Sequence, residues 1–258
     1  MSLLRTERHG TVSRLILSDE TSRNSLSEPM LNALIEAFDD ENGPIIIASE
    51  GKAFCAGHNL KELTAHRSQN DGGEDYFVKI FDLCAHLMTR IATHPCPVIA
   101  EVNGLASAAG CQLVATCDLA FASEGATFCT PGVNIGLFCS TPMVALSRSV
   151  AHKHAMEMLL TGNIFDAQFA YRAGLVNAVV PAENLSRHVM DIAEHIVSRS
   201  MAAIKFGKSI FHEQRSAGLT ESYDLCSAVM VENILEPSAQ EGIGAFLEKR
   251  KAIWPPRQ

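Results

Sequence analysis

The stretch GKAFCAGHNL, at residues 51–60, joins an expected strand to an expected helix through a turn of small residues. Apolar residues fill positions 44–49 just before it, as is typical of a strand that is covered on both faces. Asn59 is suited to cap a helix that begins at Leu60. A helix that starts there leaves free backbone N–H groups over a crevice, and the small Ala56 would let a ligand approach them closely.

The same arrangement is repeated further along the chain. Residues 97–102 give a second apolar strand pattern, Asn103 and Gly104 predict a turn, and the small residues 105–110 open an apolar helix. Two such turns could each direct one amide N–H at a single oxygen atom. We therefore expect a site that stabilises a thioester enolate or a tetrahedral oxyanion without a charged side chain.

The composition favours one domain that binds neither nucleic acid nor an anionic membrane. With 258 residues, of which 47% are hydrophobic and 19% charged, the chain can bury a large core. Its formal net charge of −8 disfavours polyanionic partners, although a local basic pocket for a phosphorylated small molecule is compatible with it. No apolar run approaches the roughly 18 residues that a membrane span needs, so we expect no such span.

The eight cysteines include no CxxC pair and lie mostly among apolar residues. This pattern is typical of reduced core thiols rather than of disulfides or a metal site. Residues 1–10 lack the apolar core of a secretory signal. We therefore expect a cytoplasmic protein, or a protein of an organellar matrix if a presequence has been removed.

Strand patterns lie early in the chain and helical patterns late. Strands are expected at 12–17, 44–49, 97–102, 119–122 and 175–180, and a surface loop at 64–75. The apolar spacing predicts a helix headed by Ser27 and others at 76–93, 141–150, 153–160, 166–172, 183–199, 201–215, 219–234 and 238–250. We expect residues 1–195 to form the core and residues 196–258 a helical region of the same domain.

Several polar side chains near the two turns are candidates for a site. His58 lies in the glycine turn, and Gln112 lies one turn into the second helix. A histidine bonded to local backbone and a glutamine on a helix surface are equally compatible with these positions. Ser107 lacks a GxSxG elbow, so we expect it to pack rather than to act as a nucleophile. Cys139 and Ser140 form a small polar cluster whose direction the sequence leaves open.

Three stretches, GHNLKEL, NGLASAAGCQLVATCD and TPGVNIGLFCSTP, resemble motifs of the crotonase superfamily, the enoyl-CoA hydratase/isomerase group. The resemblance extends from about Thr11 to Trp254. It implies an α/β crotonase (ClpP-like) spiral of ββα units with a C-terminal helical region used in trimerisation. It also implies an acyl-CoA thioester as substrate, no separate cofactor, and a homotrimer or a dimer of trimers.

The resemblance assigns roles to residues by motif position. The two backbone amides that hold the thioester oxygen fall at His58 and Ala109. The segment that contacts CoA in the family corresponds to His58, Asn59, Leu60 and Lys61. Arg23 and Lys61 match basic positions that meet the CoA phosphates in some relatives, although a solvated charge without a specific contact is the more common case.

The same resemblance exposes three departures. The two glutamates that activate water in the family's hydratases fall at Gln112 and Gly132, and an aspartate position of other relatives falls at Ser140. A glutamine does not exchange a proton at neutral pH, and glycine has no side chain. Because a positioned acid or base typically contributes about 10²–10⁴-fold to a rate, we expect weak hydration.

Two alternatives follow from these departures. Decarboxylation of a malonyl-type thioester gives the enolate without a base, and the family's methylmalonyl-CoA decarboxylases also have histidine at the position of His58. They pair it with a tyrosine near Cys139, which this chain lacks. A non-catalytic acyl-CoA binding or regulatory protein is the other alternative.

Overall fold

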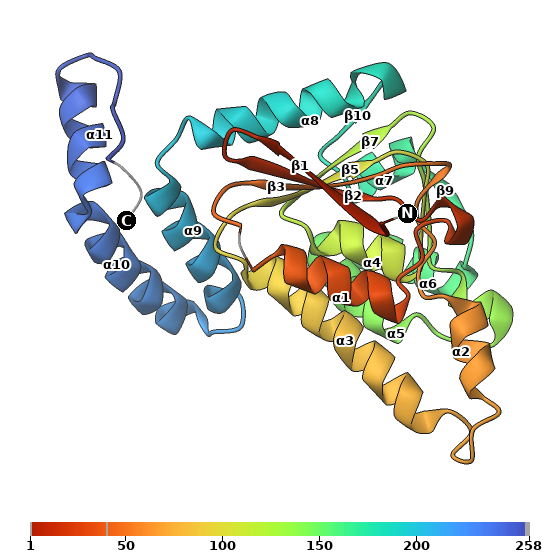
Figure 1. Cartoon of the computed structure of the whole chain (residues 1–258). Helices are drawn as coiled ribbons and strands as arrows, with labels where there is room; N and C mark the ends of the chain where they lie inside the picture. The colour runs from red at the N-terminus through yellow and green to blue at the C-terminus, as the bar shows by residue number, and fades with distance from the viewer. Residues whose placement is uncertain (1, 40, 256–258) are drawn as a thin grey trace.

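The computed structural model describes residues 2–39 and 41–255, and its larger sheet has the strand order β1-β2-β3-β5-β7-β10 (Figure 1). The strands of this sheet are β1 (Leu4–His9), β2 (Val12–Leu17), β3 (Ile45–Ser49), β5 (Val98–Val102), β7 (Leu119–Ser123) and β10 (Ala178–Val180). β1 and β2 pair antiparallel, and every other neighbouring pair in this sheet is parallel.

A smaller sheet of four short strands runs in the order β4-β6-β8-β9. Its strands are β4 (Ala53–Cys55), β6 (Leu105–Ser107), β8 (Thr127–Cys129) and β9 (Phe165–Asp166). The pairs β4–β6 and β6–β8 are parallel, and β8–β9 is antiparallel. Each pair of strands, β3-β4, β5-β6 and β7-β8, gives one strand to each sheet and then leads into a helix. This repetition confirms the expected spiral of ββα units.

Helices follow the strand pairs and cover the sheets. α2 (Leu60–His66) and α3 (Glu74–Thr93) come after the first pair, and α4 (Ala109–Thr116) comes after the second. The third pair leads into a 3₁₀ helix, η2 (Pro131–Ile135), and then into α5 (Ser140–Ser149). The remaining helices are the 3₁₀ helix η1 (Glu20–Ser22), α1 (Glu28–Ala37), α6 (His152–Thr161), α7 (Ala167–Ala173), α8 (Ala182–Val197), α9 (Met201–Gln214), α10 (Leu219–Leu235) and α11 (Pro237–Leu247).

The centre of the larger sheet is buried on both faces, which explains the unbroken apolar run at 44–49. Ile45 and Ile47 belong to a core cluster that includes residues of α1, α3 and α4. Ile46 and Ala48 belong to a second cluster, in which residues of α8 cover the opposite face. Successive side chains of a strand point to opposite faces, so a strand between two helical layers needs apolar residues at every position.

Four details differ from the sequence-based expectations. Residues 4–9 form an edge strand whose mostly polar, exposed side chains give no apolar signal. Residues 105–107 form β6, so the helix expected from 105 begins only at Ala109. α2 extends to His66 and α3 begins at Glu74, so the loop expected at 64–75 is limited to the residues between them. Of the strand expected at 175–180, only Ala178–Val180 pairs with β7.

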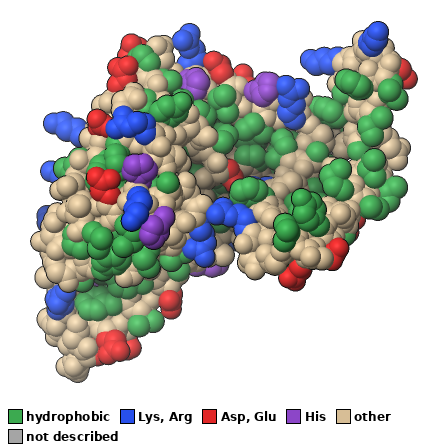
Figure 2. Space-filling model, turned by 180° about the vertical axis from the view of Figure 1, so that it is seen from behind, with side chains coloured by type: hydrophobic (Ala, Val, Ile, Leu, Met, Phe, Trp, Pro, Cys, Tyr) green, Lys and Arg blue, Asp and Glu red, His purple; other side chains and the backbone are tan. Residues whose placement is uncertain are grey.

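The helices α9, α10 and α11, which we call the arm, lie to one side of the sheets (Figure 1). Lys208 fastens the arm to the core, because its Nζ donates to Asp118 Oδ2 at 2.6 Å and to the carbonyl oxygens of Ile91 and Cys96. Hydrophobic side chains gather along the arm (Figure 2), and among them Leu219, Phe246 and Leu247 are 78%, 81% and 73% exposed. Among the described helices, none combines the length and the apolar character that crossing a membrane requires.

Candidate active site

The two strand-to-helix turns lie against each other. They follow β4 and β6, which are parallel neighbours. A Cβ atom placed on Gly57 would lie 3.3 Å from the amide nitrogen of Ala109 and 2.9 Å from the carbonyl oxygen of Ser107. Only a glycine fits here without displacing the facing backbone, and Gly57 also has a φ of +87°, which favours glycine. The contact brings the first turn within reach of the start of α4.

The backbone at the start of α4 is strained. Ala108 has φ 50° and ψ −115°, a conformation that an L-residue adopts only when its surroundings hold it. Hydrogen bonds supply that restraint, because the Ala108 N–H donates to the Cys129 carbonyl at 2.9 Å and the Ala108 carbonyl accepts from Gln112 N at 3.0 Å. Ala109 is the first residue of the helix, so its N–H has no acceptor within α4. This N–H is available to a ligand.

His58 has a fixed ring and an unused amide. Its Nδ1 lies 3.3 Å from the Leu26 carbonyl oxygen, and a carbonyl only accepts, so Nδ1 carries the hydrogen. Burial lowers the pKa of His58, so its ring is neutral near pH 7. Nε2 is buried and has no partner among the described residues, and the ring meets the edge of Phe81 with centroids 5.2 Å apart. No backbone hydrogen bond recorded between described residues uses the His58 N–H.

His58 and Ala109 both line a cleft of about 560 Å³. Its other lining residues are Ala56, Leu60, Leu63, Phe81, Ser107, Ala108, Pro131, Gly132, Asn134, Ile135, Leu137, Phe138, Cys139, Ser140, Thr141 and Pro142. None of these described residues carries a formal charge. The cleft is therefore an apolar space with two unused amide donors at its inner wall.

The position of Gly132 is closely confined. A Cβ atom there would lie 2.9 Å from the Leu137 carbonyl oxygen and 3.0 Å from Cys139 Sγ. Cys139 is 7% exposed, and burial raises the pKa of its thiol, so the thiol is protonated near pH 7. The wall of the cleft at Gly132 offers neither a carboxylate nor a thiolate.

Gln112 is not among the residues that line the cleft. Its side chain is 4% exposed and lines a neighbouring cavity between α3, α4, α5 and α9. Ala108 and Ala109 line the cleft, whereas Gln112 lies one helical turn further along the same face of α4. The carboxylates of Glu101 and Asp118 do not line the cleft either. Glu101 binds Arg14 at 2.7 Å, and Asp118 binds Lys208 at 2.6 Å.

The two candidate basic residues are exposed beside the glycine turn. Arg23 has a φ of 58°, and its carbonyl oxygen accepts from Ala56 N at 3.1 Å. Lys61 lies in the first turn of α2, where Asn59 Oδ1 accepts from the amides of Lys61 and Glu62. Within residues 2–39 and 41–255, no ion pair includes Arg23 or Lys61. Their charges are therefore free to meet an anion.

Sequence reasoning missed much of the apolar wall. Phe81 lies in the helix that the sequence predicts at 76–93, and it is 39% exposed and lines the cleft. Ile135, Leu137 and Phe138 are 58%, 53% and 42% exposed on the segment between η2 and α5. The only available signal was an apolar cluster in a segment without strand or helix periodicity.

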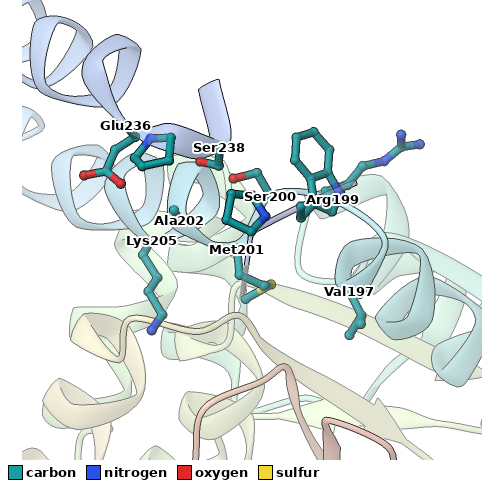
Figure 3. A pocket seen from close by; sticks show the side chains of 11 residues that line it. Val197, Arg199, Ser200, Met201, Ala202, Lys205, Glu236 and Ser238 are labelled. Atoms are coloured by element: carbon teal, nitrogen blue, oxygen red, sulfur yellow. The ribbon is translucent and has the colours of Figure 1, made fainter. Parts of the chain in front are cut away.

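A separate cavity of about 260 Å³ lies at the joints of the arm (Figure 3). Its labelled side chains include Lys205 from α9 and Glu236 from the junction of α10 and α11. None of the residues that line this cavity also lines the cleft. It is therefore distinct from the candidate site.

The chain is similar to known proteins over nearly its whole length. The family model described as enoyl-CoA hydratase/isomerase matches residues 7–257. Enoyl-CoA hydratase domain-containing protein 3, mitochondrial, from Xenopus laevis is 50% identical over 253 residues, covering 96% of this chain and 84% of the relative. The human protein of the same description is 47% identical, covering 94% of this chain and 80% of the relative.

Solved structures show the same likeness. A crystal structure of human enoyl-CoA hydratase domain-containing protein 3 has a TM-score of 0.93 at 44% identity and covers 98% of this chain and 100% of that one. A crystal structure of an enoyl-CoA hydratase from Mycobacterium smegmatis also has a TM-score of 0.93 at 44% identity, covering 98% of both chains.

Proposed function

Since the chain belongs to the enoyl-CoA hydratase/isomerase family, we propose that its cleft binds an acyl-CoA thioester and that the N–H groups of His58 and Ala109 bind the thioester oxygen. The observation that carries this proposal is the contact between the two turns, which places Gly57 against the Ala109 amide. Two fixed donors aimed at one oxygen stabilise an enolate more than a neutral carbonyl, because the negative charge develops on that oxygen.

Other features support a CoA ester as the ligand. The cleft offers apolar side chains to an acyl group, whereas the exposed Arg23 and Lys61 offer positive charge to phosphates. Both basic residues lie next to the segment 56–60 in the fold, so one ligand could contact the amides and the charges together. The thioester is itself the reacting group, so the proposal requires no separate cofactor.

We propose weak enoyl-CoA hydration, because the cleft offers no acid–base pair. Its described lining has no aspartate or glutamate, and Gly132 has no side chain to activate water. His58 is neutral but its Nε2 is buried, and the Cys139 thiol is protonated near pH 7. Hydration would then depend on the oxyanion donors alone, so it would lack the roughly 10²–10⁴-fold that each positioned acid or base contributes.

Crotonyl-CoA hydration, followed by loss of enoyl absorbance, tests this proposal. The wild type is compared with Gln112→Glu, Gly132→Glu and the double variant. We expect little activity in the wild type. A gain in the double variant would show that carboxylates at these two positions reach the substrate, although Gln112 lines the neighbouring cavity and Gly132 is closely confined. Ordinary enzymic rates in the wild type would show that another residue acts as the base, and the argument from the missing carboxylates would fail.

Decarboxylation is a second candidate, favoured by the uncharged cleft. Breaking the C–C bond of a malonyl-type thioester leaves its electron pair as the enolate, releases CO₂, and requires no base. Water then supplies the proton to the α-carbon. Turnover of methylmalonyl-CoA, measured as CO₂ release, would support this candidate. Tight binding of several CoA esters without turnover of any would favour a non-catalytic binding or regulatory protein instead.

We also propose that the arm joins copies of the chain into a homotrimer or a dimer of trimers. The exposed apolar side chains of α10 and α11 support this, because a surface of this kind is usually buried against another protein. Light scattering of the purified protein would measure the assembly. The word mitochondrial in the names of the relatives favours an organellar matrix over the cytoplasm that we expected from the sequence.

A further inference from the structure

Residues of α4 and α5 line both the cleft and the cavity that contains Gln112. Its volume is about 480 Å³. Ala109 of α4 and Ser140 of α5 line the cleft, whereas Gln112 and Val144 line the cavity. Residues three and four apart share one face of a helix, and α4 and α5 pack against each other. The cleft and the cavity therefore lie at successive turns of the same two helices.

Part of the cavity is apolar. Methylene groups of an acyl chain could pack there against the side chains of Met88, Ala92 and Ala115. From Ala109 to Thr116, α4 advances roughly 10 Å at about 1.5 Å per residue. This distance is comparable to the length of an acyl chain of medium length, measured from a thioester held at Ala109.

The far end of the cavity is cationic. Arg148 Nη1 donates to the Val144 carbonyl at 2.8 Å, and Arg215 Nη2 donates to the Arg148 carbonyl at 2.9 Å. No ion pair between described residues includes either arginine. Both also line an adjoining hollow of about 440 Å³, together with His212. Each of the two guanidinium groups therefore has further N–H donors that could bind an anion.

The other polar groups of the cavity do not oppose an anion. Asp118 also lines it, but its Oδ2 accepts from Lys208 Nζ at 2.6 Å and from Val98 N at 2.7 Å. Burial lowers the pKa of His212, which leaves it as a neutral donor or acceptor near pH 7. Gln112 is 4% exposed, and its Oε1 has no partner among the described residues. A buried amide without a partner favours a ligand that brings polar groups or water into the cavity.

We propose that the cavity holds the distal half of the acyl chain and that Arg148 and Arg215 bind a carboxylate at its end. The preferred ligand is then the mono-CoA thioester of a medium-length dicarboxylic acid. This inference rests on the proposed function, because the thioester must first be held at His58 and Ala109. A carboxylate accepts charge-assisted hydrogen bonds from the two guanidinium groups, whereas an alkyl end would meet charges and water.

Calorimetric binding of octanoyl-CoA and of the mono-CoA thioester of octanedioic acid tests the inference. We expect the wild type to bind the dicarboxylic thioester about tenfold more tightly at low salt, and high salt to reduce the preference because the arginines are exposed. In the double variant Arg148→Gln/Arg215→Gln, the ratio of the two affinities should fall to near one. Arg172→Gln, which removes an exposed arginine on α7, is the matched control and should keep the preference.

The outcomes separate this inference from the proposed function. If neither thioester binds, the proposed function fails, and the inference fails with it. If both bind equally well, or if the preference survives in the double variant, only the inference is overturned. Free octanedioate that binds together with the thioester would show an independent anion site and would also overturn it. Should the double variant not fold, a preference in the wild type that is insensitive to salt would contradict the role of the arginines.

Discussion

The Sγ atom of Cys139 lies directly beside Gly132, at 3.0 Å from where a Cβ atom of that glycine would stand. The Leu137 carbonyl oxygen lies at 2.9 Å from the same point. A side chain at residue 132 therefore needs the segment around 137–139 to move. Gly132 therefore offers no carboxylate, and the neighbouring backbone and thiol also occupy the space that a side chain would need.

Gly132→Glu should destabilise the protein, because the new Cβ meets backbone and sulfur at less than a normal contact distance. Overpacking of this kind typically costs about 1–3 kcal/mol. Thermal unfolding followed by circular dichroism measures the loss. Gly125→Glu is the matched control, since a Cβ at Gly125 meets nothing within 4 Å. Equal melting temperatures for the two variants would contradict the crowding.

Gly57→Ala should weaken acyl-CoA binding as well as stability. The new methyl group would lie 2.9 Å from the Ser107 carbonyl and 3.3 Å from the Ala109 amide nitrogen, so it would displace a proposed oxyanion donor. Gly72→Ala separates this crowding from backbone strain, because Gly72 also has a positive φ, of 69°, but an added Cβ has open space. We expect only Gly57→Ala to reduce the affinity for crotonyl-CoA, by about two- to tenfold, because a lost hydrogen bond between neutral groups costs about 0.5–1.5 kcal/mol. Equal affinities for both variants would count against the amide at Ala109.

Lys208→Met should loosen the arm. The Lys208 side chain is 8% exposed and neutralises Asp118, so the substitution leaves a part-buried carboxylate without its cation. Breaking a buried pair from one side costs about 3–5 kcal/mol, and the partial exposure of Asp118 should reduce this to about half. Hydrogen exchange of α9 should rise together with the fall in the free energy of unfolding. Lys153→Met, at an exposed lysine without an ion pair among the described residues, should change neither.

His58 should make the protein less stable in mild acid. Burial lowers its pKa in the folded state, so the unfolded chain takes up the proton first as the pH falls. The stability is therefore complete above the ordinary histidine pKa of about 6.5 and is lost as the pH falls from there through the folded pKa. Urea unfolding at several pH values measures the slope, which His58→Asn should reduce. His86→Asn, at an exposed histidine, should leave the slope as in the wild type.

Local sequence determined the strands and caps that frame the site. The apolar run at 44–49 predicted a strand buried on both faces, and β3 lies between two core clusters. Ser27 and Asn59 were expected to begin helices, and their side chains accept from Met30 N and from the amides of Lys61 and Glu62. These features depend on residues close in the chain, so their periodicity and capping chemistry are visible in the sequence.

The tertiary structure decided which face each residue shows to the site. β1 and β6 had no apolar signal of their own, because β1 is an exposed edge strand and β6 has three residues held by β4 and β8. Phe81 lines the cleft, whereas Gln112, which the sequence offered as a site candidate, lines the neighbouring cavity. Segment 137–142 helps to form the cleft, and segment 211–215, which is distant in the sequence, helps to form the cavity. The pattern of one helix gives the direction of a side chain around its own axis, but only packing between helices determines what that side chain meets.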